Sequence, residues 1–293
     1  MNQKFPLLDT FVWYLNERWS IHQKRLKGLP PPWTDDSALQ KYRFCQVRRE
    51  DDRVTRWIHE NWLRPHADDP DLWHAIYIAR IYRPEALTII GWPEPWGLRR
   101  KGALQRARAY QRAGNKVFTA AYTLHCCDPA PPGDCKMTAY YEIIFNQLWQ
   151  NRKFLQPTKS DMLMDVRDRL VTQYNIGNFM AAQIIADTKF GNTLRNASDW
   201  DTFAVGGPGS LRGLNRVCGR ELNQRWREAD WHATLLEVRK TIRSSLPKAL
   251  RDLDAQNVEH GLCELDKWCR VAEGRRPKQV YSAIQSKYFK EAE

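Results

Sequence analysis

The sequence predicts an all-α protein, because apolar residues recur at helical spacing along most of the chain and strict polar–apolar alternation is rare. Residues 7–26 illustrate the pattern, with Leu8, Val12, Leu15 and Trp19 at roughly helical steps. Glycines and prolines that stop helices separate such segments. We therefore expect helices to build the whole fold.

Residues that end helices separate the segments with helical periodicity, and they define the bounds of the other expected helices. Gly28 and the prolines at 30–32 end the first helix, and Thr34-Asp35-Asp36 resembles an N-cap for a helix over 37–63. Further helices are expected at roughly 70–90, 101–112, 138–154, 160–174, 179–190, 211–227, 230–243 and 247–269.

The chain is long enough to bury a substantial core, and we expect one helical domain over residues 1–293. A segment rich in proline and glycine near 126–136 is the best candidate for a boundary between two lobes. The tail at 274–293 is basic and could form an arm or a phosphate contact.

The charge balance predicts a polyanionic partner. Lys and Arg number 46 against 34 Asp and Glu, which gives a net charge of +12. Such an excess favours nucleic acid through counterion release. The 13 Trp, 11 Tyr and 10 Phe mostly belong in a core, although aromatic faces can also stack unpaired bases.

The seven cysteines show no regular metal spacing, so we expect no structural metal site. Their odd number and the lack of an N-terminal apolar run favour a reducing compartment, here a cytoplasm. No long apolar stretch is present, so we expect no membrane partner.

A glycine-rich stretch, 206–216, is a candidate phosphate site. Gly207 and Gly209 let backbone N–H groups approach an anion, and Ser210 can cap the next helix. Arg212 can add charge-assisted hydrogen bonds, and the candidate loop extends to Asn215. The alternative is an ordinary glycine turn between two helices.

Two acids, Asp199 and Asp201, precede this stretch. Carboxylates beside an anion site favour chemistry over simple adhesion. We take both aspartates as candidate catalytic residues.

A second basic cluster contains Arg48, Arg49 and Arg53. These guanidinium groups could clamp phosphates. Because Glu50, Asp51 and Asp52 lie among them, the alternative is an internally paired, solvated helix face.

Four chemically distinct side chains fall on one helical face near the C-terminus. His260, Cys263, Glu264 and Lys267 stand at i, i+3, i+4 and i+7. A His or Lys beside a thiol favours the thiolate, and a carboxylate can orient the partner base. The alternative is a surface ion pair beside a small, inert core cysteine.

Two families resemble parts of this chain. Tyr174-Asn175-Ile176-Gly177, followed by Asp187 and then Asp201-Thr202, resembles the helix-hairpin-helix and downstream aspartate of DNA glycosylases. Over a longer range, Trp33-Thr34-Asp35, the cluster at 48–53, the Gly-Pro-Gly-Ser stretch and the face at 260–267 resemble the alpha-glutamyl/putrescinyl thymine pyrophosphorylases of phages. That family is similar to the helical domain of 5-hydroxymethyluracil DNA kinases.

The resemblance implies a helical, DNA-glycosylase-like architecture with two lobes around a cleft for DNA and an extruded base. It implies a transferase that replaces pyrophosphate on activated 5-hydroxymethyluracil in double-stranded DNA with an amino acid or polyamine. No P-loop is present, so a separate 5-hydroxymethyluracil DNA kinase is an expected partner. No cofactor is expected to be required, although Mg²⁺ could accompany the substrate pyrophosphate.

In this chemistry Asp201 or Asp199 would take the proton of the amine or fix its ammonium, and the 207–215 loop, Arg48 and Arg53 would stabilise the leaving pyrophosphate. Cys263 could add to the base ring, or displacement could proceed without a covalent step. His260 and Glu264 could form an amino-acid pocket, with Lys267 binding a carboxylate or a phosphate. The alternative functions are a DNA glycosylase and a noncatalytic DNA-binding or kinase-accessory domain.

Overall fold

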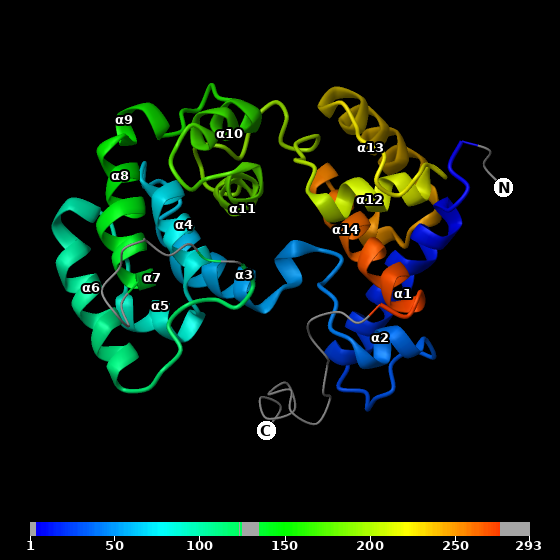
Figure 1. Ribbon diagram of the computed structural model, residues 1–293, viewed down its shortest axis with the longest axis horizontal. Coiled ribbons are helices and arrows are strands. Elements are labelled where there is room, and N and C mark those ends of the chain that lie inside the picture. Colours follow the sequence, from blue (N-terminus) through cyan, green and yellow to red (C-terminus); the bar gives the residue numbers. More distant parts are fainter. Residues whose placement is uncertain (1–3, 123, 125–134, 276–293) are drawn as a thin grey trace. The chain divides into compact units, whose positions relative to one another are not determined.

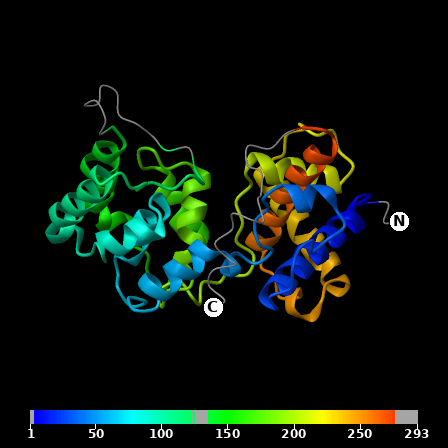
Figure 2. The same cartoon turned by 90° about the horizontal axis from the view of Figure 1, so that it is seen from below.

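The computed structural model describes residues 4–122, 124 and 135–275. All regular elements in these ranges are helices (Figures 1 and 2), and isolated bridge residues occur at Tyr42 and in the antiparallel pair Tyr82 and Phe118. The predicted all-α class is therefore confirmed.

The chain divides into two compact units. The terminal unit combines Met1–Asp52 with Ala204–Glu293, and the central unit is Arg53–Phe203. The chain thus passes between units after Asp52 and after Phe203. The boundary predicted near 126–136 falls mainly on residues outside the described ranges, as does the basic tail from residue 276 onward.

The terminal unit is built from two long helices and several shorter ones. Its helices are α1 (Leu8–Leu26), α2 (Ser37–Lys41), α12 (Pro208–Val217), α13 (Glu228–Ile242) and α14 (Ala255–Ala272), with 3-10 turns η1 (Arg49–Asp51), η4 (Arg243–Ser245) and η5 (Lys248–Leu250). The periodicity predicted for 7–26 and 230–243 matches α1 and α13 closely.

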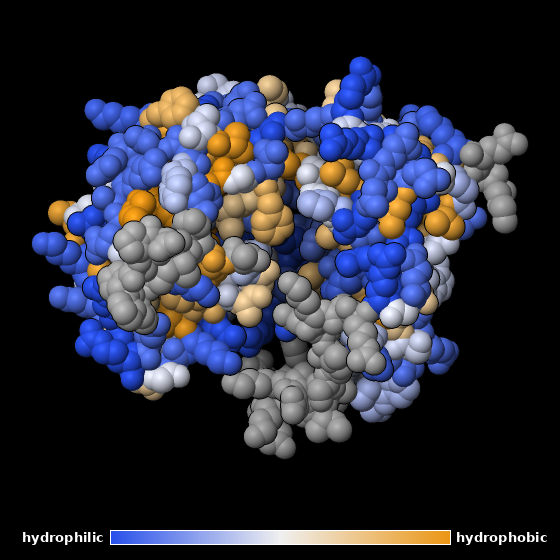
Figure 3. Space-filling model, viewed as in Figure 1, coloured by the Kyte–Doolittle hydropathy of each residue, from blue (hydrophilic) through white to orange (hydrophobic). Residues whose placement is uncertain are grey.

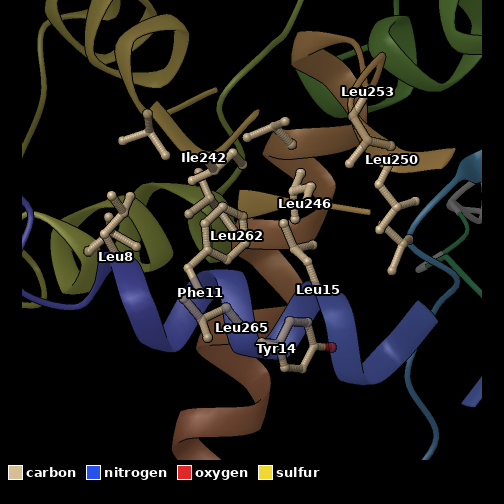
Figure 4. Close-up of a cluster of buried hydrophobic side chains, with 14 of the residues drawn as sticks. Leu8, Phe11, Tyr14, Leu15, Ile242, Leu246, Leu250, Leu253, Leu262 and Leu265 are labelled. Carbon is tan, nitrogen blue, oxygen red and sulfur yellow. The ribbon is translucent and has the colours of Figure 1, made fainter. Parts of the chain in front are cut away.

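The core of the terminal unit joins segments that are far apart in sequence. Leu8, Phe11 and Leu15 line one face of α1 at helical spacing and are buried. Figure 4 shows them beside Leu262 and Leu265 of α14. The two chain ends therefore fold as a single hydrophobic unit.

The prediction of one helix over 37–63 is wrong. The α2 helix ends at Lys41, and the chain is non-helical until η1. The buried Arg18 guanidinium donates to the carbonyl oxygens of Phe44 and Cys45, and the Glu264 carboxylate accepts from Cys45 N at 2.8 Å. These tertiary hydrogen bonds satisfy backbone groups that a helix would otherwise pair.

Two other predicted boundaries shift for local reasons. The α12 helix starts earlier than expected because Pro208 occupies its first turn, and it ends at Val217, shortly before Gly219 adopts φ +62°. The α14 helix starts at Ala255, where the Asp254 carboxylate accepts from Asn257 N at 2.7 Å.

The central unit contains the remaining helices. They are α3 (Arg53–Ile58), α4 (Leu72–Ile81), α5 (Pro84–Ile90), α6 (Trp96–Arg112), α7 (Cys135–Thr138), α8 (Phe145–Gln150), α9 (Arg152–Leu155), α10 (Leu163–Val171) and α11 (Asn178–Thr188), with π-helical turns η2 (His59–Leu63) and η3 (Ala139–Ile144). The helix predicted at 70–90 is interrupted before Pro84, which starts α5.

An ion pair lies inside the central unit between α4 and α11. The Arg80 guanidinium contacts both carboxylate oxygens of Asp187 at 2.5 and 2.6 Å, and the Asp187 side chain is fully buried. His59 Nε2 lies 3.3 Å from the same carboxylate. This bidentate pair fixes α4 against the hairpin helix α11.

The turn between α10 and α11 carries the glycosylase-like motif. Asn175 adopts φ +64°, the left-handed conformation that asparagine tolerates better than most residues. Gly177 then precedes α11 as its N-cap. The side chains of Tyr174 and Phe179 remain exposed on either side of the turn.

Candidate functional site

The polar face of α14 is the centre of the candidate site. His260, Cys263, Glu264 and Lys267 share this face, as predicted, and Glu259 adjoins them. The α12 helix and the segment before η1 pack against it. The site therefore lies within the terminal unit and combines three segments that are separate in sequence.

The glycines of α12 permit very close packing against α14. A Cβ atom at Gly213 would collide with the carbonyl group of Leu262, and one at Gly209 would collide with Cys263 Sγ. The two glycines are four residues apart and so lie on one helix face. Their observed role is helix packing, which differs from the ordinary glycine turn that was the alternative, and phosphate binding by this stretch stays a prediction.

Glu259 places a carboxyl group at the start of α12. Beside it, the Gly207 N–H donates to Ser210 Oγ at 2.9 Å and the Ser210 hydroxyl donates to Gly207 O at 3.1 Å, at the position predicted for a bound phosphate. Burial raises the pKa of Glu259 to about 7, although Ser210, Gly207 and the Arg49 charge act in the opposite direction. Glu259 is therefore close to half-ionised at neutral pH, and its side chain remains partly exposed.

The polar residues farther along α12 bind other parts of the protein. Arg212 Nε donates to the buried Asp266 carboxylate at 2.9 Å, and Arg216 Nε contacts the other oxygen at 3.1 Å. The buried Asn215 side chain donates to the carbonyl oxygens of Leu222 and Gln224. In this structure Arg212 and Asn215 stabilise the terminal unit.

Glu264 and Lys267 hold the extended segment before η1. Lys267 Nζ donates to Arg43 O at 2.5 Å and to Glu264 Oε2 at 3.2 Å. Burial raises the pKa of Glu264, but Lys267, His260 and the Cys45 N–H outweigh this effect and hold the pKa below its ordinary value. Glu264 is thus an ionised anchor at neutral pH.

Cys263 and His260 are both neutral in this environment. Burial raises the pKa of Cys263 to about 12, and the carboxylates of Glu259, Glu264 and Asp266 add to the shift. Burial lowers the pKa of His260, the Glu264 charge opposes this shift, and Arg49 adds to it. The surroundings therefore disfavour the thiolate that covalent catalysis by Cys263 would require.

Cys263 is expected to alkylate slowly with iodoacetamide at pH 8. The fraction of Cys263 present as thiolate would be about three orders of magnitude below that of an unperturbed cysteine. A thiolate with a higher pKa is also a stronger nucleophile, and this recovers about one and a half of those three orders of magnitude in rate. We expect roughly 50-fold slower labelling, measured by peptide mass spectrometry with the urea-unfolded chain as the reference. Labelling at the unfolded rate would contradict the assigned environment.

The three predicted phosphate-clamping arginines have different surroundings. Arg48 donates to Ala249 O and pairs with Asp252, both in the terminal unit. The Arg49 N–H donates to Asn257 Oδ1 at 2.9 Å, and its charge acts on Glu259 and His260. Arg53 begins the central unit, with Glu85 Oε1 3.9 Å away. Of the three, Arg49 belongs to the α14 site.

The two predicted catalytic aspartates lie in the central unit. The Asp199 carboxylate accepts from Leu163 N at 2.7 Å and Met164 N at 3.0 Å, so it caps the start of α10. Asp201 is exposed. The capping contacts give Asp199 a structural role, and they leave the catalytic assignment of Asp201 a prediction.

The sequence around 260–267 also contains two site residues, Glu259 and Asp266, whose roles become apparent only from their contacts in the structure. Glu259 precedes Cys263 by one helical turn, but nothing local indicates that it reaches the start of α12. Asp266 lies among the same residues and is fully buried between arginines. One helix carries several acidic residues, and separate segments of the chain are rich in arginine. This complementarity is the signal that could have suggested the roles of Glu259 and Asp266.

Within the described part of the chain, no cluster of three or more His, Cys, Asp or Glu side chains could hold a metal ion. Nor does any helix there have the length and apolar character needed to cross a membrane.

Comparisons with known proteins identify the family. The family model for the helical domain of 5-hmdU DNA kinase matches residues 5–276. The 5-hmdU DNA kinase of Bacillus phage SP10 is 26% identical over 93% of this chain and 48% of its own length, so the chain spans about half the length of that relative. No solved structure matches the chain. Because the family match covers nearly all of the described residues, this chain belongs to the family of 5-hmdU DNA kinase helical domains.

Proposed function

We propose that this chain is a DNA-modifying transferase that replaces the pyrophosphate of activated 5-hydroxymethyluracil with an amine. The match to the helical domain of a 5-hmdU DNA kinase over residues 5–276 carries the proposal, because it associates the chain with modification of this base. The net charge of +12 suits a DNA substrate. The residues resembling the thymine pyrophosphorylases supply the specific reaction.

The proposed reaction forms one bond and breaks one bond at the 5-methylene carbon of the base. The amine nitrogen forms the new C–N bond while the C–O bond to pyrophosphate breaks. The amine must lose its proton to attack, and the leaving pyrophosphate takes the bonding electrons. A base for the amine and cations for the leaving group are therefore the two catalytic requirements.

Glu259 is the best-placed base in the α14 site. Its carboxyl group titrates near neutral pH, where a general base is most effective, and it is partly exposed. The neutral His260 adjoins it and can accept a hydrogen bond from the amine or its substituent. The Arg49 guanidinium is the nearby cation for the departing pyrophosphate, and Mg²⁺ carried by that pyrophosphate would assist.

The hairpin between α10 and α11 is a candidate for DNA contact. Its exposed rings, Tyr174 and Phe179, are each about half accessible, at 52% and 53%. Such rings can stack on unpaired bases, and extrusion of the target base would expose one. In this proposal Glu259, not Asp201, acts as the first base.

The proposal predicts a new amine-adducted thymidine when the protein meets its substrate. DNA bearing pyrophosphorylated 5-hydroxymethyluracil is incubated with the protein and a mixture of amino acids and polyamines, and nucleosides are analysed by mass spectrometry. The adduct and released pyrophosphate should appear in equal amounts, and the mass names the amine. Unchanged nucleosides from protein-bound DNA would overturn the transferase.

The same assay separates the alternatives. A second candidate, a noncatalytic accessory domain, is favoured by the chain's correspondence to only 48% of the SP10 kinase, because that kinase contains other regions. An accessory domain would bind the DNA without altering its nucleosides. A glycosylase using Asp201 would instead release the base and leave an abasic site.

A further inference from the structure

The terminal unit carries a net charge of +7 and the central unit +5, and within the central unit the positive charge is concentrated in one segment. Residues 95–127 contain seven Lys or Arg and no Asp or Glu, so this segment contributes +7 of the chain's +12. The remainder of the central unit has 13 basic and 15 acidic residues, a net charge of −2. The excess is therefore local, and most of it lies on α6.

The α6 helix buries one face and exposes basic side chains across the remaining arc, with Lys101 and Arg112 on one flank and Arg99 on the other. Trp96, Ala103 and Ala107 lie in the core, whereas Leu98 is 85% exposed. Five basic residues are also exposed on α6 and just beyond it: Arg106, and a further four, Arg99, Lys101, Arg112 and Lys116. Figure 3 shows mainly hydrophilic surface at the edge of the central unit where α6 lies in Figure 1.

Several other basic residues of the chain are held by polar partners, unlike these four. Arg48, Arg212 and Arg216 contact carboxylates, and Arg106 of α6 donates to the carbonyl oxygens at the end of α5. Among the described residues, no carboxylate forms an ion pair with the four exposed residues, and their side chains make no hydrogen bond there. We define these four residues as the α6 basic surface.

Exposed basic side chains in a segment without carboxylates favour a polyanionic partner. Lys101 and Arg112 are eleven residues apart, which places them about 16 Å apart along the helix axis. A duplex presents a phosphate charge about every 1.7 Å of its axis, so this span faces several phosphates. The absence of acids from the whole segment also removes the repulsion that a phosphate backbone would otherwise meet.

We propose that the α6 basic surface binds the sugar–phosphate backbone of duplex DNA. The choice of DNA as the polyanion rests on the proposed function, whereas the location rests on the charge distribution. The contact is with backbone phosphates and so is independent of base modification. It gives the central unit a DNA-holding role separate from the chemistry proposed on α14.

Replacing all four residues by glutamine tests this surface. Binding to an unmodified 30-base-pair duplex is measured by fluorescence anisotropy between 50 and 200 mM KCl. Each lost phosphate contact should lower the salt slope by about 0.9, so a reduction of about 3 to 4 and at least tenfold weaker binding at 100 mM are expected. Thermal melting checks that the variant folds.

A charge-matched control replaces four exposed lysines elsewhere: Lys27, Lys159, Lys240 and Lys248. It loses the same net charge and should keep most of the wild-type salt slope. The proposal would be overturned if both variants lost the same amount of salt slope, or if the α6 variant kept the wild-type slope. It would also be overturned if the wild type did not bind the duplex. Because the duplex is unmodified, failure of the transferase reaction would leave this result unaffected.

Discussion

Replacing Glu259 by glutamine is expected to lower the rate of amine transfer by about 10²- to 10⁴-fold, the usual contribution of a positioned general base. The substitution keeps the shape of the side chain and its contacts with Ser210 and Gly207, but it removes the proton acceptor. The measurement is single-turnover transfer with pre-bound DNA and saturating amine. DNA affinity should remain unchanged, because Glu259 is not part of the α6 basic surface.

The pH dependence identifies the group more directly. The base acts when ionised, so the wild-type rate should rise with pH through about 7 and then level off, following the pKa of Glu259. The facing groups are Arg49, Ser210, His260 and Cys263; burial raises the pKa of the Cys263 thiol and lowers that of the His260 imidazole, so both shifts are directed away from that pH. The rate of the glutamine variant should not rise with pH in this range.

Stability separates a catalytic role from a structural one. The pKa of Glu259 is raised from 4.5 to about 7 in the folded protein. Ionisation of Glu259 therefore lowers the free energy of unfolding as pH rises from 4.5 to about 7, and the whole loss of stability is present above pH 7. At pH 8 the glutamine variant should be as stable as the wild type or more stable, by up to about 3 kcal/mol.

Glu273→Gln is the matched control, because Glu273 ends the same helix and pairs with Arg216 at an exposed position. It should change neither the rate nor the pH profile. If the Glu259→Gln variant kept both the wild-type rate and the rise in rate near pH 7, Glu259 would not be the base in the reaction.

Replacing Gly213 by alanine is expected to destabilise the terminal unit by at least about 3 kcal/mol, at or above the upper end of ordinary overpacking costs. The added methyl group would meet the Leu262 carbonyl, which belongs to the backbone of α14 and cannot rotate away. The two helices would have to separate, and the ion pairs of Arg212 and Arg216 with Asp266 would weaken with them. Urea unfolding measures the change.

Gly207→Ala provides the comparison at the start of the same helix. A Cβ there meets nothing closer than Glu259 Oε1 at 4.0 Å, so only the weaker N-cap preference of alanine applies, about 0.5–1 kcal/mol. If Gly213→Ala cost no more than Gly207→Ala, the close packing of α12 on α14 would be wrong.

Local sequence alone determined the all-α class and the long helices. The apolar spacing of α1 is strong enough to place it within one or two residues, and Pro208 and Asp254 mark helix starts by their own chemistry. The motifs also led to the family, whose helical-domain description matches nearly the whole described chain. The transferase reaction itself remains a proposal.

Only the tertiary structure decided what the motifs do. Segment 42–48 has helical spacing, yet Arg18 and Glu264 pair its backbone groups and keep it extended. The glycines at 209 and 213 suit either a phosphate or a neighbouring helix, and α14 occupies that space. Glu259 acquires its raised pKa, and Glu264 its lowered one, because burial and charge partners come from segments that are remote in sequence. Sequence spacing sets which residues share a helix face, whereas a pKa depends on everything packed against that face.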